Sequence, residues 1–555
     1  MDRLIALMGF DKMEDFLLKF VIPVIGVSIL LFFSTMLFLS LPFWVPYLFL
    51  LGGIIFIAAY PVILRELKKV EIHENIHFFI TYAGTISTLH INRTMLFKKI
   101  AEGRKYGVIS DTAEKIVYLA KAWNLGFART CRKMAALAPS RIFGDFLDRF
   151  AAVLDFGEDL ETFLTEEQDA VMDDYETEYK KSLESIKMLQ EVFISMTISI
   201  AFGMAAALLL PLIMGISIMV VIKWALLALI VMDMLMVLLI KGFIPSDTIC
   251  HDLPIKDEGT KRLHKSLMIT FPVSFILLAL LFWWNRLPFL TNLAVASTPL
   301  IVSGLLAVEE ENDVFRRDKA FPAFIRSLGG TIYVRQGGVI SSLGALRVHD
   351  FGILNPMVIN LYRRLRLGSD RFKSWIYFAG ETGSNMIKNF INIFAESVYL
   401  GGNAQQIANI ISKNFTRLLS LRKLRLQLAS GLRGSLYGAL LGFTTTVYMS
   451  AAITKLLSGM FSSAFEASQV QGEMASIVSS ILPPIPSVDM FTVNIYIGVM
   501  VLVHSIMSAL MVKLVDGGNK YAALFDMNLM LWLGALLGWG VPKMANWAFG
   551  TMALG

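Results

Sequence analysis

The sequence predicts an all-α polytopic membrane protein with about nine transmembrane helices and two repeated cytoplasmic helical-bundle domains. Three observations lead to this fold class. Hydrophobic residues make up 55% of the 555-residue chain and charged residues only 17%. Apolar segments of roughly 20 residues, enough to cross a hydrocarbon core of about 30 Å, recur along the chain. Two polar stretches with the apolar spacing of helices interrupt these segments, at 64–191 and 309–433.

The apolar segments define the predicted spans. In chain order they are 20–40, 43–63, 192–213, 218–240, 267–283, 289–308, 434–456, 491–513 and 524–542. The third and fourth spans are separated only by residues 214–217 and must therefore form a tight hairpin.

Lys and Arg orient the spans, because cytoplasmic segments of membrane proteins carry an excess of both. Nearly all of them lie in the segments 1–19, 64–191, 241–266, 309–433 and 514–523. The loop 457–490 on the other side has none. We therefore expect a multi-pass protein of the cell membrane with a cytoplasmic N-terminus, a retained segment 1–19 and an external C-terminus.

The predicted domains follow from this topology. They are 1–63, an N-terminal segment with two spans; 64–191, the first cytoplasmic helical domain; 192–308, four spans; 309–433, the second cytoplasmic helical domain; and 434–555, three spans with the external loop 457–490.

The two polar domains contain related sequences. The stretch FFITYAGTISTL at 78–89 matches FIRSLGGTIYV at 324–334, and FLDRFAAVLDFGEDL at 146–160 matches FINIFAESVYLGGNA at 390–404. Both pairs lie about 245 residues apart, a common offset that indicates an internal duplication. The repeated unit is a span, a helical bundle and a further span, in parallel orientation.

This duplicated unit resembles the type II secretion F-domain superfamily, the membrane platform proteins of type IV pili, type II secretion and archaella. The glycines of TYAGT and SLGGT, and the turns at Phe156–Gly157 and 400–402, lie where the repeats of that family carry them. The length and the additional spans look most like the archaeal platform proteins. The resemblance covers about residues 43–456. It implies a non-enzymatic platform on which a cytoplasmic hexameric ATPase docks, with pilin or archaellin subunits as further partners and no cofactor.

Catalytic motifs give little support to an enzyme. The chain has no G-x-x-x-x-G-K-[ST] phosphate loop, and Cys131 and Cys250 form no CxxC pair. The exception is an H-E-x-x-H motif, in which His73 and His77 would bind zinc and Glu74 would be the general base of a membrane metalloprotease. A third ligand among His90, Glu102 and Glu114 is suggested only by elimination. This protease remains the alternative to the platform, and a transporter is disfavoured because the repeats are parallel and mostly cytoplasmic.

Small and ionisable residues within the spans suggest helix contacts. Gly434, Gly438 and Gly442 form a stripe that lets another helix approach closely, either within the bundle or in a homodimer. Lys223 and Asp233 are costly in a bilayer unless they reach water or a partner. Lys223 can snorkel to the surface, and His504 is a candidate partner for Asp233. That pair would lock the bundle or contact a filament subunit.

The second polar domain is the predicted docking site for the ATPase. It contains 18 Lys and Arg against 9 Asp and Glu, whereas the first domain is near balance. The residues that we expect to contact an acidic surface are Arg363, Arg364, Arg366, Arg371 and Lys373, with Arg422, Lys423 and Arg425 as the next candidates. Gly368 and Ser369 predict an exposed turn within the first cluster. The alternative is attraction to lipid, which fades within about 8–10 Å of the membrane. No feature predicts a nucleic-acid partner.

Overall fold

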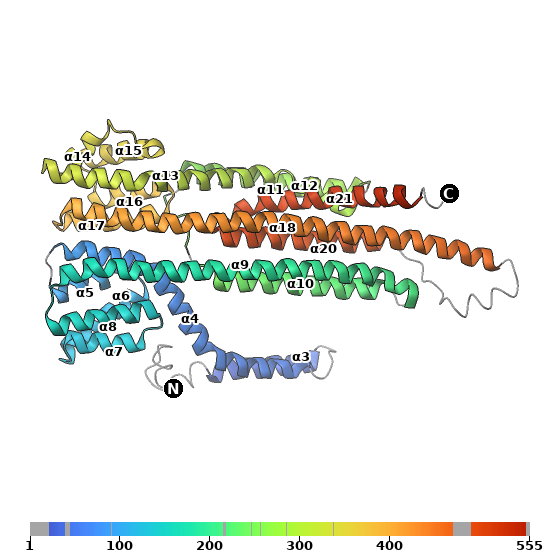
Figure 1. The fold of residues 1–555 in the computed structure, drawn as a ribbon, viewed down its shortest axis with the longest axis horizontal. Coiled ribbons are helices and arrows are strands. Elements are labelled where there is room, and N and C mark those ends of the chain that lie inside the picture. Colours follow the sequence, from blue (N-terminus) through green and yellow to red (C-terminus); the bar gives the residue numbers. More distant parts are fainter. Residues whose placement is uncertain are drawn as a thin grey trace. The chain divides into compact units, whose positions relative to one another are not determined.

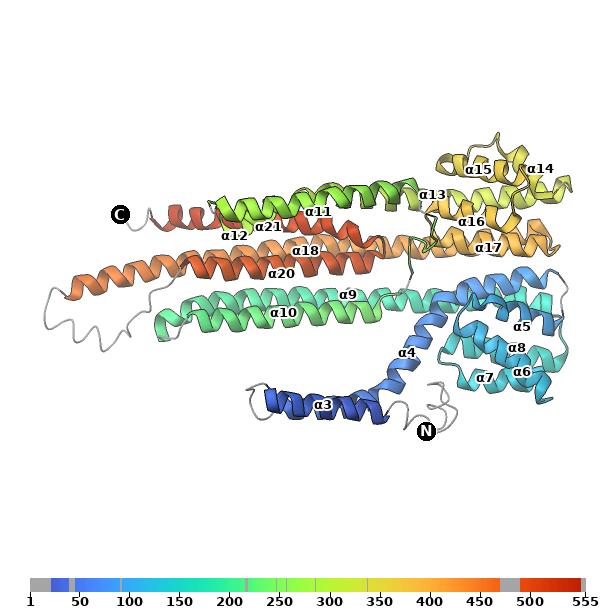
Figure 2. The same ribbon diagram turned by 180° about the vertical axis from the view of Figure 1, so that it is seen from behind.

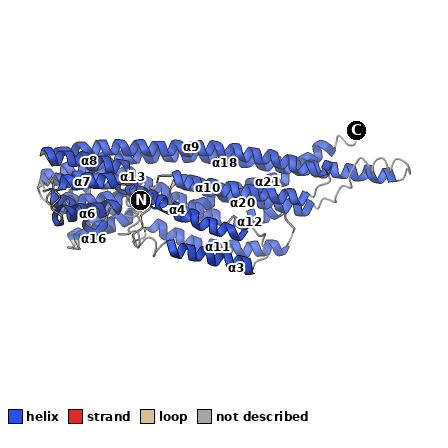
Figure 3. Ribbon diagram, turned by 90° about the horizontal axis from the view of Figure 1, so that it is seen from below, coloured by secondary structure: helices blue, strands red, loops and turns tan. Residues whose placement is uncertain are grey.

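In the computed structural model every described element is a helix. The description covers residues 21–38, 45–89, 92–214, 218–245, 247–255, 257–284, 286–336, 338–469 and 490–550. A single isolated β-bridge, between Cys250 and Ser384, interrupts the helical pattern of this part of the chain. Colouring by secondary structure shows helices throughout (Figure 3). The all-α class predicted from the sequence is confirmed.

Six described helices are long and apolar enough to cross a membrane. A seventh span is formed if α12 (Phe289–Ser297) and α13 (Leu300–Arg335) are counted together, since they meet at an angle of 49°. Pro299 lies at this break, where its ring and missing N–H prevent a continuous helix. These helices contain the seven predicted spans from 192–213 onward.

The first two predicted spans correspond to α3 (Ile22–Phe38) and to the start of α4 (Val45–Ser87). The total of nine spans therefore stays a prediction. Segment 1–19 and residues 470–489 of the predicted loop 457–490 lie outside the described residues. The beginning of that loop is helical, because α18 continues past the predicted end of its span to Gln469.

The helices of the two polar domains follow one order. After α4 come α5 (Arg93–Ala101), η2 (Glu102–Arg104), α6 (Val108–Ala122), α7 (Phe127–Leu137), α8 (Arg141–Phe156) and α9 (Leu160–Met214). After α13 come α14 (Gly338–Leu346), η3 (Gly352–Leu354), α15 (Asn355–Arg366), α16 (Arg371–Thr382), α17 (Asn385–Tyr399) and α18 (Ala404–Gln469). The turns before α9 and α18 contain Gly157 and Gly401, both with a positive φ, of 72° and 96°.

The remaining helices belong to the apolar part of the chain. They are α10 (Ile218–Phe243), α11 (Glu258–Trp284), α20 (Met490–Asp516), η4 (Lys520–Ala522) and α21 (Ala523–Gly550). The helices α9 and α18 have 55 and 66 residues, so each joins a polar bundle to a predicted span without a break.

The chain divides into two compact units. The first contains Met1–Thr177 together with Ile393–Asn414, and the second contains Glu178–Asn392 and Phe415–Gly555. The first polar bundle is thus completed by a segment from the second repeat. The domain boundaries proposed from the sequence stay a prediction.

Aromatic side chains fill the interior of both polar bundles. In the first, the Phe79 ring lies 6.0 Å from that of Phe143 and 5.3 Å from that of Phe146. In the second, Phe321 lies 4.7 Å from Phe415, which joins α13 to α18. Figures 1 and 2 show α14, α15 and α16 beside the last part of α13, away from α12 and α21. The helices that carry the basic cluster therefore lie at the polar end of the second unit.

Candidate docking site

The basic cluster at 361–373 lies on α15, on α16 and in the turn between them. This turn, residues 367–370, begins with the C-cap Leu367, whose N–H donates to the carbonyl of Arg363 at 3.0 Å. Gly368 follows with a φ of +77°, a conformation that favours glycine. Asp370 then caps α16, accepting a hydrogen bond from the N–H of Lys373 at 2.7 Å. The turn expected at Gly368 and Ser369 is present and exposed.

Four of the five predicted docking side chains in this cluster are exposed, namely Arg363, Arg366, Arg371 and Lys373. The fifth, Arg364, is half-buried and forms an ion pair with Glu381 of α16. Its guanidinium also lies 5.2 Å from the centre of the Tyr377 ring. Arg364 therefore joins α15 to α16.

Two large apolar side chains accompany these charges. Leu367 is 84% exposed and Phe372 is 51% exposed. Interfaces commonly combine arginine with apolar and aromatic anchors of this kind, surrounded by a polar rim. We call the surface formed by Arg363, Arg366, Leu367, Phe372 and Lys373 the second-repeat tip.

The second-repeat tip lies well beyond the predicted end of the membrane span at residue 308. On α13, Phe324 is roughly 24 Å past Val308 at the rise of an α-helix. The helix α16 runs antiparallel to α13, since Arg317 bonds to the carbonyl of Thr382 at 3.0 Å and Phe324 contacts Phe378 at 5.7 Å. The start of α16 is therefore roughly 30 Å from residue 308. Lipid attraction is weak at such a distance.

The further docking candidates Arg422, Lys423 and Arg425 lie on α18 and have different surroundings from the basic cluster. Lys423 is exposed, but Arg422 and Arg425 are only 3% and 4% exposed. Both arginines belong to the buried face of α18 and cannot reach a partner protein there. Their inclusion in a docking surface does not agree with the structure, because their side chains bond inside the second unit.

Arg422 is held by two carboxylates. Its guanidinium contacts Asp247 at 2.6 and 2.8 Å and Asp318 of α13 at 2.9 Å. Burial raises the pKa of Asp318 to about 6, and the nearby Arg422 opposes this rise. The arginine thus compensates two carboxylates at the base of the polar bundle.

Arg425 is bound by backbone carbonyls. It donates to Val515 at 2.7 Å and Leu514 at 3.2 Å, at the end of α20, and to Pro245 and Asp247, each at 3.1 Å, in the segment after α10. Cations at a helix C-terminus are favourable because the last carbonyls have no intrahelical partner. Together the two arginines connect α18 to the end of α20 and to the segment after α10. A cavity of about 170 Å³ lies among these groups.

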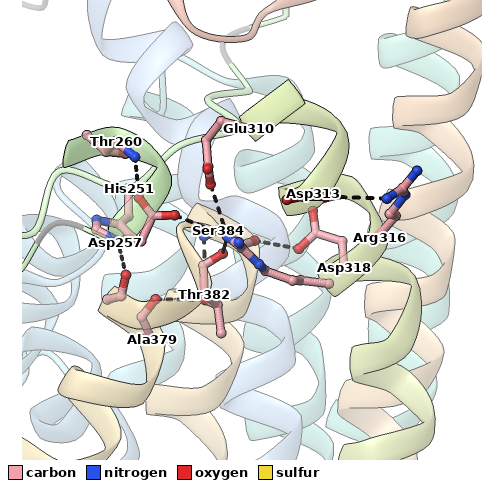
Figure 4. Close-up of polar contacts among 12 residues, drawn as sticks. His251, Asp257, Thr260, Glu310, Asp313, Arg316, Asp318, Ala379, Thr382 and Ser384 are labelled. Carbon is pink, nitrogen blue, oxygen red and sulfur yellow. Dashed lines mark hydrogen bonds and ion pairs between the residues drawn. The ribbon is translucent and has the colours of Figure 1, made fainter. Parts of the chain in front are cut away.

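A second ionic group includes Asp257, Glu310 and Asp318 (Figure 4). Arg317 contacts Glu310 at 3.0 Å and Asp257 at 3.3 Å, and Ser384 donates to Asp318. Burial, together with the neighbouring carboxyl of Asp257, raises the pKa of Glu310 to about 8. Glu310 therefore takes up a proton more readily than an exposed glutamate does. The sequence did not suggest Asp257, Glu310 or Arg317.

Within the predicted spans, Asp233 has the partner proposed from the sequence. His504 Nδ1 lies 3.1 and 3.2 Å from the two carboxylate oxygens of Asp233, and both side chains are fully buried. The rings of Phe193 and Phe443 lie 5.6 and 5.5 Å from the imidazole. Four helices therefore meet at His504. Lys223 is exposed on α10, and its position at the membrane surface stays a prediction.

The glycine stripe on α18 has no neighbour among the described residues. A Cβ added at Gly434, Gly438 or Gly442 would meet no atom within 4 Å, and all three residues are exposed. No described contact therefore supports the interpretation of this stripe as packing within the chain. Close approach occurs instead on α21, where a Cβ on Gly538 would lie 2.8 Å from the Tyr448 ring.

The H-E-x-x-H residues contribute to the first bundle. His73 Nε2 lies 3.1 Å from the hydroxyl of Ser140, and the His77 ring lies 4.0 Å from Phe78 and 4.9 Å from Tyr175. Glu74 is exposed. In the part of the chain that the structure describes, no three His, Cys, Asp or Glu side chains come together as metal ligands.

Comparison with known proteins identifies relatives along almost the whole chain. The family model of type II secretion system protein F matches residues 79–211. Flagella accessory protein J of Methanocaldococcus jannaschii is 35% identical over 540 residues, or 95% of this chain and 94% of that protein. Flagella accessory protein J of Methanococcus voltae is 30% identical over 545 residues, 95% of each chain. No solved structure matches.

Proposed function

Because this chain belongs to the flagella accessory protein J family, we propose that it docks a cytoplasmic hexameric ATPase and couples it to filament assembly. The family is of the non-enzymatic platform type, and the long apolar helices agree with a multi-pass membrane protein. The ATPase, the filament subunits and the direction of the motion are parts of the proposal. Archaellin subunits are the partners that the names of the relatives favour over adhesive pilins.

The observation that carries the docking proposal is the second-repeat tip. Its exposed arginines surround Leu367 and Phe372 at roughly 30 Å from the predicted membrane boundary. Arginine forks bind carboxylates, and charges at the rim of an interface mainly accelerate association. An acidic ATPase surface with an apolar pocket would complement this tip.

The proposed coupling follows α18. This helix runs without a break from the polar bundle into a predicted span, and Arg422 and Arg425 bind the ends of neighbouring helices. A displacement of the polar bundle would therefore act on several spans together. Packed elements of this kind transmit small displacements because they do not deform continuously.

Charge reversal tests the docking proposal. The variant combines Arg363→Glu, Arg366→Glu and Lys373→Glu and leaves Arg364 intact, since Arg364 pairs with Glu381. We expect it to bind the ATPase much more weakly in a salt-sensitive assay while the protein still inserts into membranes. The control is Arg141→Glu, a charge reversal at an exposed position on α8 of the other unit. Unchanged binding of the tip variant would exclude the second-repeat tip as the docking site.

The orientation of the chain is tested separately. A single cysteine at Ser369, in a variant without Cys131 and Cys250, should react with a membrane-impermeant reagent only after the membrane is opened. A cysteine near residue 468 should react from outside. The reverse pattern would contradict a cytoplasmic tip and with it the docking proposal.

A further inference from the structure

The turn between α6 and α7 in the first repeat is equivalent to the turn at the second-repeat tip. Residues 123–126 link α6 to α7 as residues 367–370 link α15 to α16, at an offset of 244. The second residue of each turn has a left-handed backbone, Asn124 with a φ of 49° and Gly368 with a φ of 77°. This conformation is uncommon outside glycine and asparagine. Its recurrence at equivalent positions shows that the duplication kept the turn.

The exposed residue types of the turn, an apolar side chain and a cation, recur as well. Trp123 is the C-cap of α6 and is 64% exposed, at the position that Leu367 occupies on α15. Arg129 is exposed two residues into α7, at the position of Lys373 on α16. Lys121 adds a second exposed cation in the last turn of α6. We call the surface of Lys121, Trp123 and Arg129 the first-repeat tip.

The fold of the first unit requires neither the exposed tryptophan nor the exposed cations of this turn. A large exposed apolar side chain contributes nothing to a core, and Trp123 lies on the outside of the bundle. Tryptophan and arginine are the residue types most enriched among those that dominate binding energy. The first-repeat tip thus has the composition of a binding surface of the same kind, although with fewer charges.

We propose that the first-repeat tip is a second docking site for the same partner, and that one platform chain engages two copies of one acidic surface. This inference rests on the proposed function of the second-repeat tip. The partner that fits is a homo-oligomer, because its symmetry presents the same surface on every subunit. Two linked contacts raise the apparent affinity by about 10²–10⁴ when the geometry allows both at once.

Binding of the purified hexameric ATPase to the full-length protein in nanodiscs tests the inference. The first-tip variant combines Lys121→Glu, Trp123→Ser and Arg129→Glu. The second-tip variant is Arg363→Glu, Arg366→Glu and Lys373→Glu, and a third protein carries both sets. The control within the first unit is Arg141→Glu, because Arg141 is 91% exposed at the start of α8, beyond the opposite end of α7 from this tip. Resistance to protease shows that each variant is folded.

We expect the first-tip variant to lose apparent affinity by about 10²-fold or more, and the double variant to bind more weakly than either single one. The control should bind like the unaltered protein. Trp123→Ser alone should weaken binding with little change in salt dependence, because it removes only apolar contact.

Two results would contradict the inference in different ways. Normal binding of the first-tip variant, with binding lost in the second-tip variant, would overturn the second site and leave the proposed function intact. Normal binding of both would overturn the docking of this partner at either tip.

Discussion

In the first unit one set of buried hydrogen bonds joins neutral side chains, whereas a set in the second unit joins buried charges. Asn414 Nδ2 donates to the hydroxyl of Thr81 at 2.9 Å and to Gln168 at 3.3 Å, and Ser397 bonds to Thr85 at 2.9 Å. In the second unit, by contrast, Arg422 is buried between two carboxylates. The helix order and the turns survived duplication, but the polar interior diverged.

This difference fits different roles for the two units. Neutral groups bury at low cost when they are paired, so the first bundle is a stable body completed by Ile393–Asn414. Buried ion pairs are expensive to desolvate and are not required for stability. We infer that the charges at the base of the second bundle hold the ends of α10 and α20 in a defined position relative to α18.

The largest expected effect comes from removing the charge at the base of the second bundle. Arg422→Leu leaves Asp318 and Asp247 without their cation, and breaking a buried pair in this way costs about 3–5 kcal/mol. The thermal unfolding of the protein in detergent should shift accordingly. Lys423→Leu is the matched control, since Lys423 is the exposed neighbour on the same helix. A small effect of Arg422→Leu would mean that the network does not hold the second unit together.

The neutral contacts of the first repeat should be less costly to remove. Asn414→Leu leaves Thr81 and Gln168 without one partner each and should lower the free energy of unfolding by about 1–3 kcal/mol. Lys413→Leu is the control, because Lys413 forms only an exposed pair with Asp169, with an expected effect of about 0–1 kcal/mol. An Asn414 effect as large as that of Arg422 would remove the distinction between the two repeats.

Two glycines at matching positions should respond in opposite directions. A Cβ on Gly84 would lie 1.8 Å from Gln168 Nε2, whereas one on Gly330 would meet no atom within 4 Å. Gly84→Ala should therefore destabilise the protein, by about 1–3 kcal/mol if Gln168 cannot move. Gly330→Ala should stabilise its helix by roughly 0.5–1 kcal/mol. Chemical denaturation of both variants measures the difference, and equal signs would contradict the divergence of the two interiors.

The sequence was sufficient to predict those structural features that depend on a local residue pattern. The apolar lengths predicted seven spans that match six long apolar helices and the bent pair α12 and α13, and Gly368 predicted an exposed turn. The burial of Arg422 and Arg425 was also detectable. They continue a stripe of buried residues at alternating spacings of three and four, which includes Phe415, Leu418 and Ala429. Charge alone suggested exposure, whereas the position on the stripe indicated burial.

Other features depend on contacts between distant segments. Glycines spaced by four residues permit close packing but do not show whether a neighbour exists, so the stripe at Gly438 could not be interpreted from the sequence. The segment Ile393–Asn414 of the second repeat belongs to the first unit, and no local sequence pattern predicts this. The pairing of Asp233 with His504 was predictable because few polar groups lie within the spans, and a buried charge requires one of them.

The smallest expected effect concerns the H-E-x-x-H motif, where the first repeat differs from the second in a way that resembles an enzyme. His73→Gln keeps an amide that can bond to Ser140, so the free energy of unfolding should change by less than about 1 kcal/mol. His77 is left intact, because its ring packs against Phe78 and Tyr175. Filament assembly should remain near normal, and metal analysis should find no tightly bound zinc. Loss of assembly in a folded and inserted variant, together with about one zinc per unaltered chain, would instead make the first repeat a metalloprotease site.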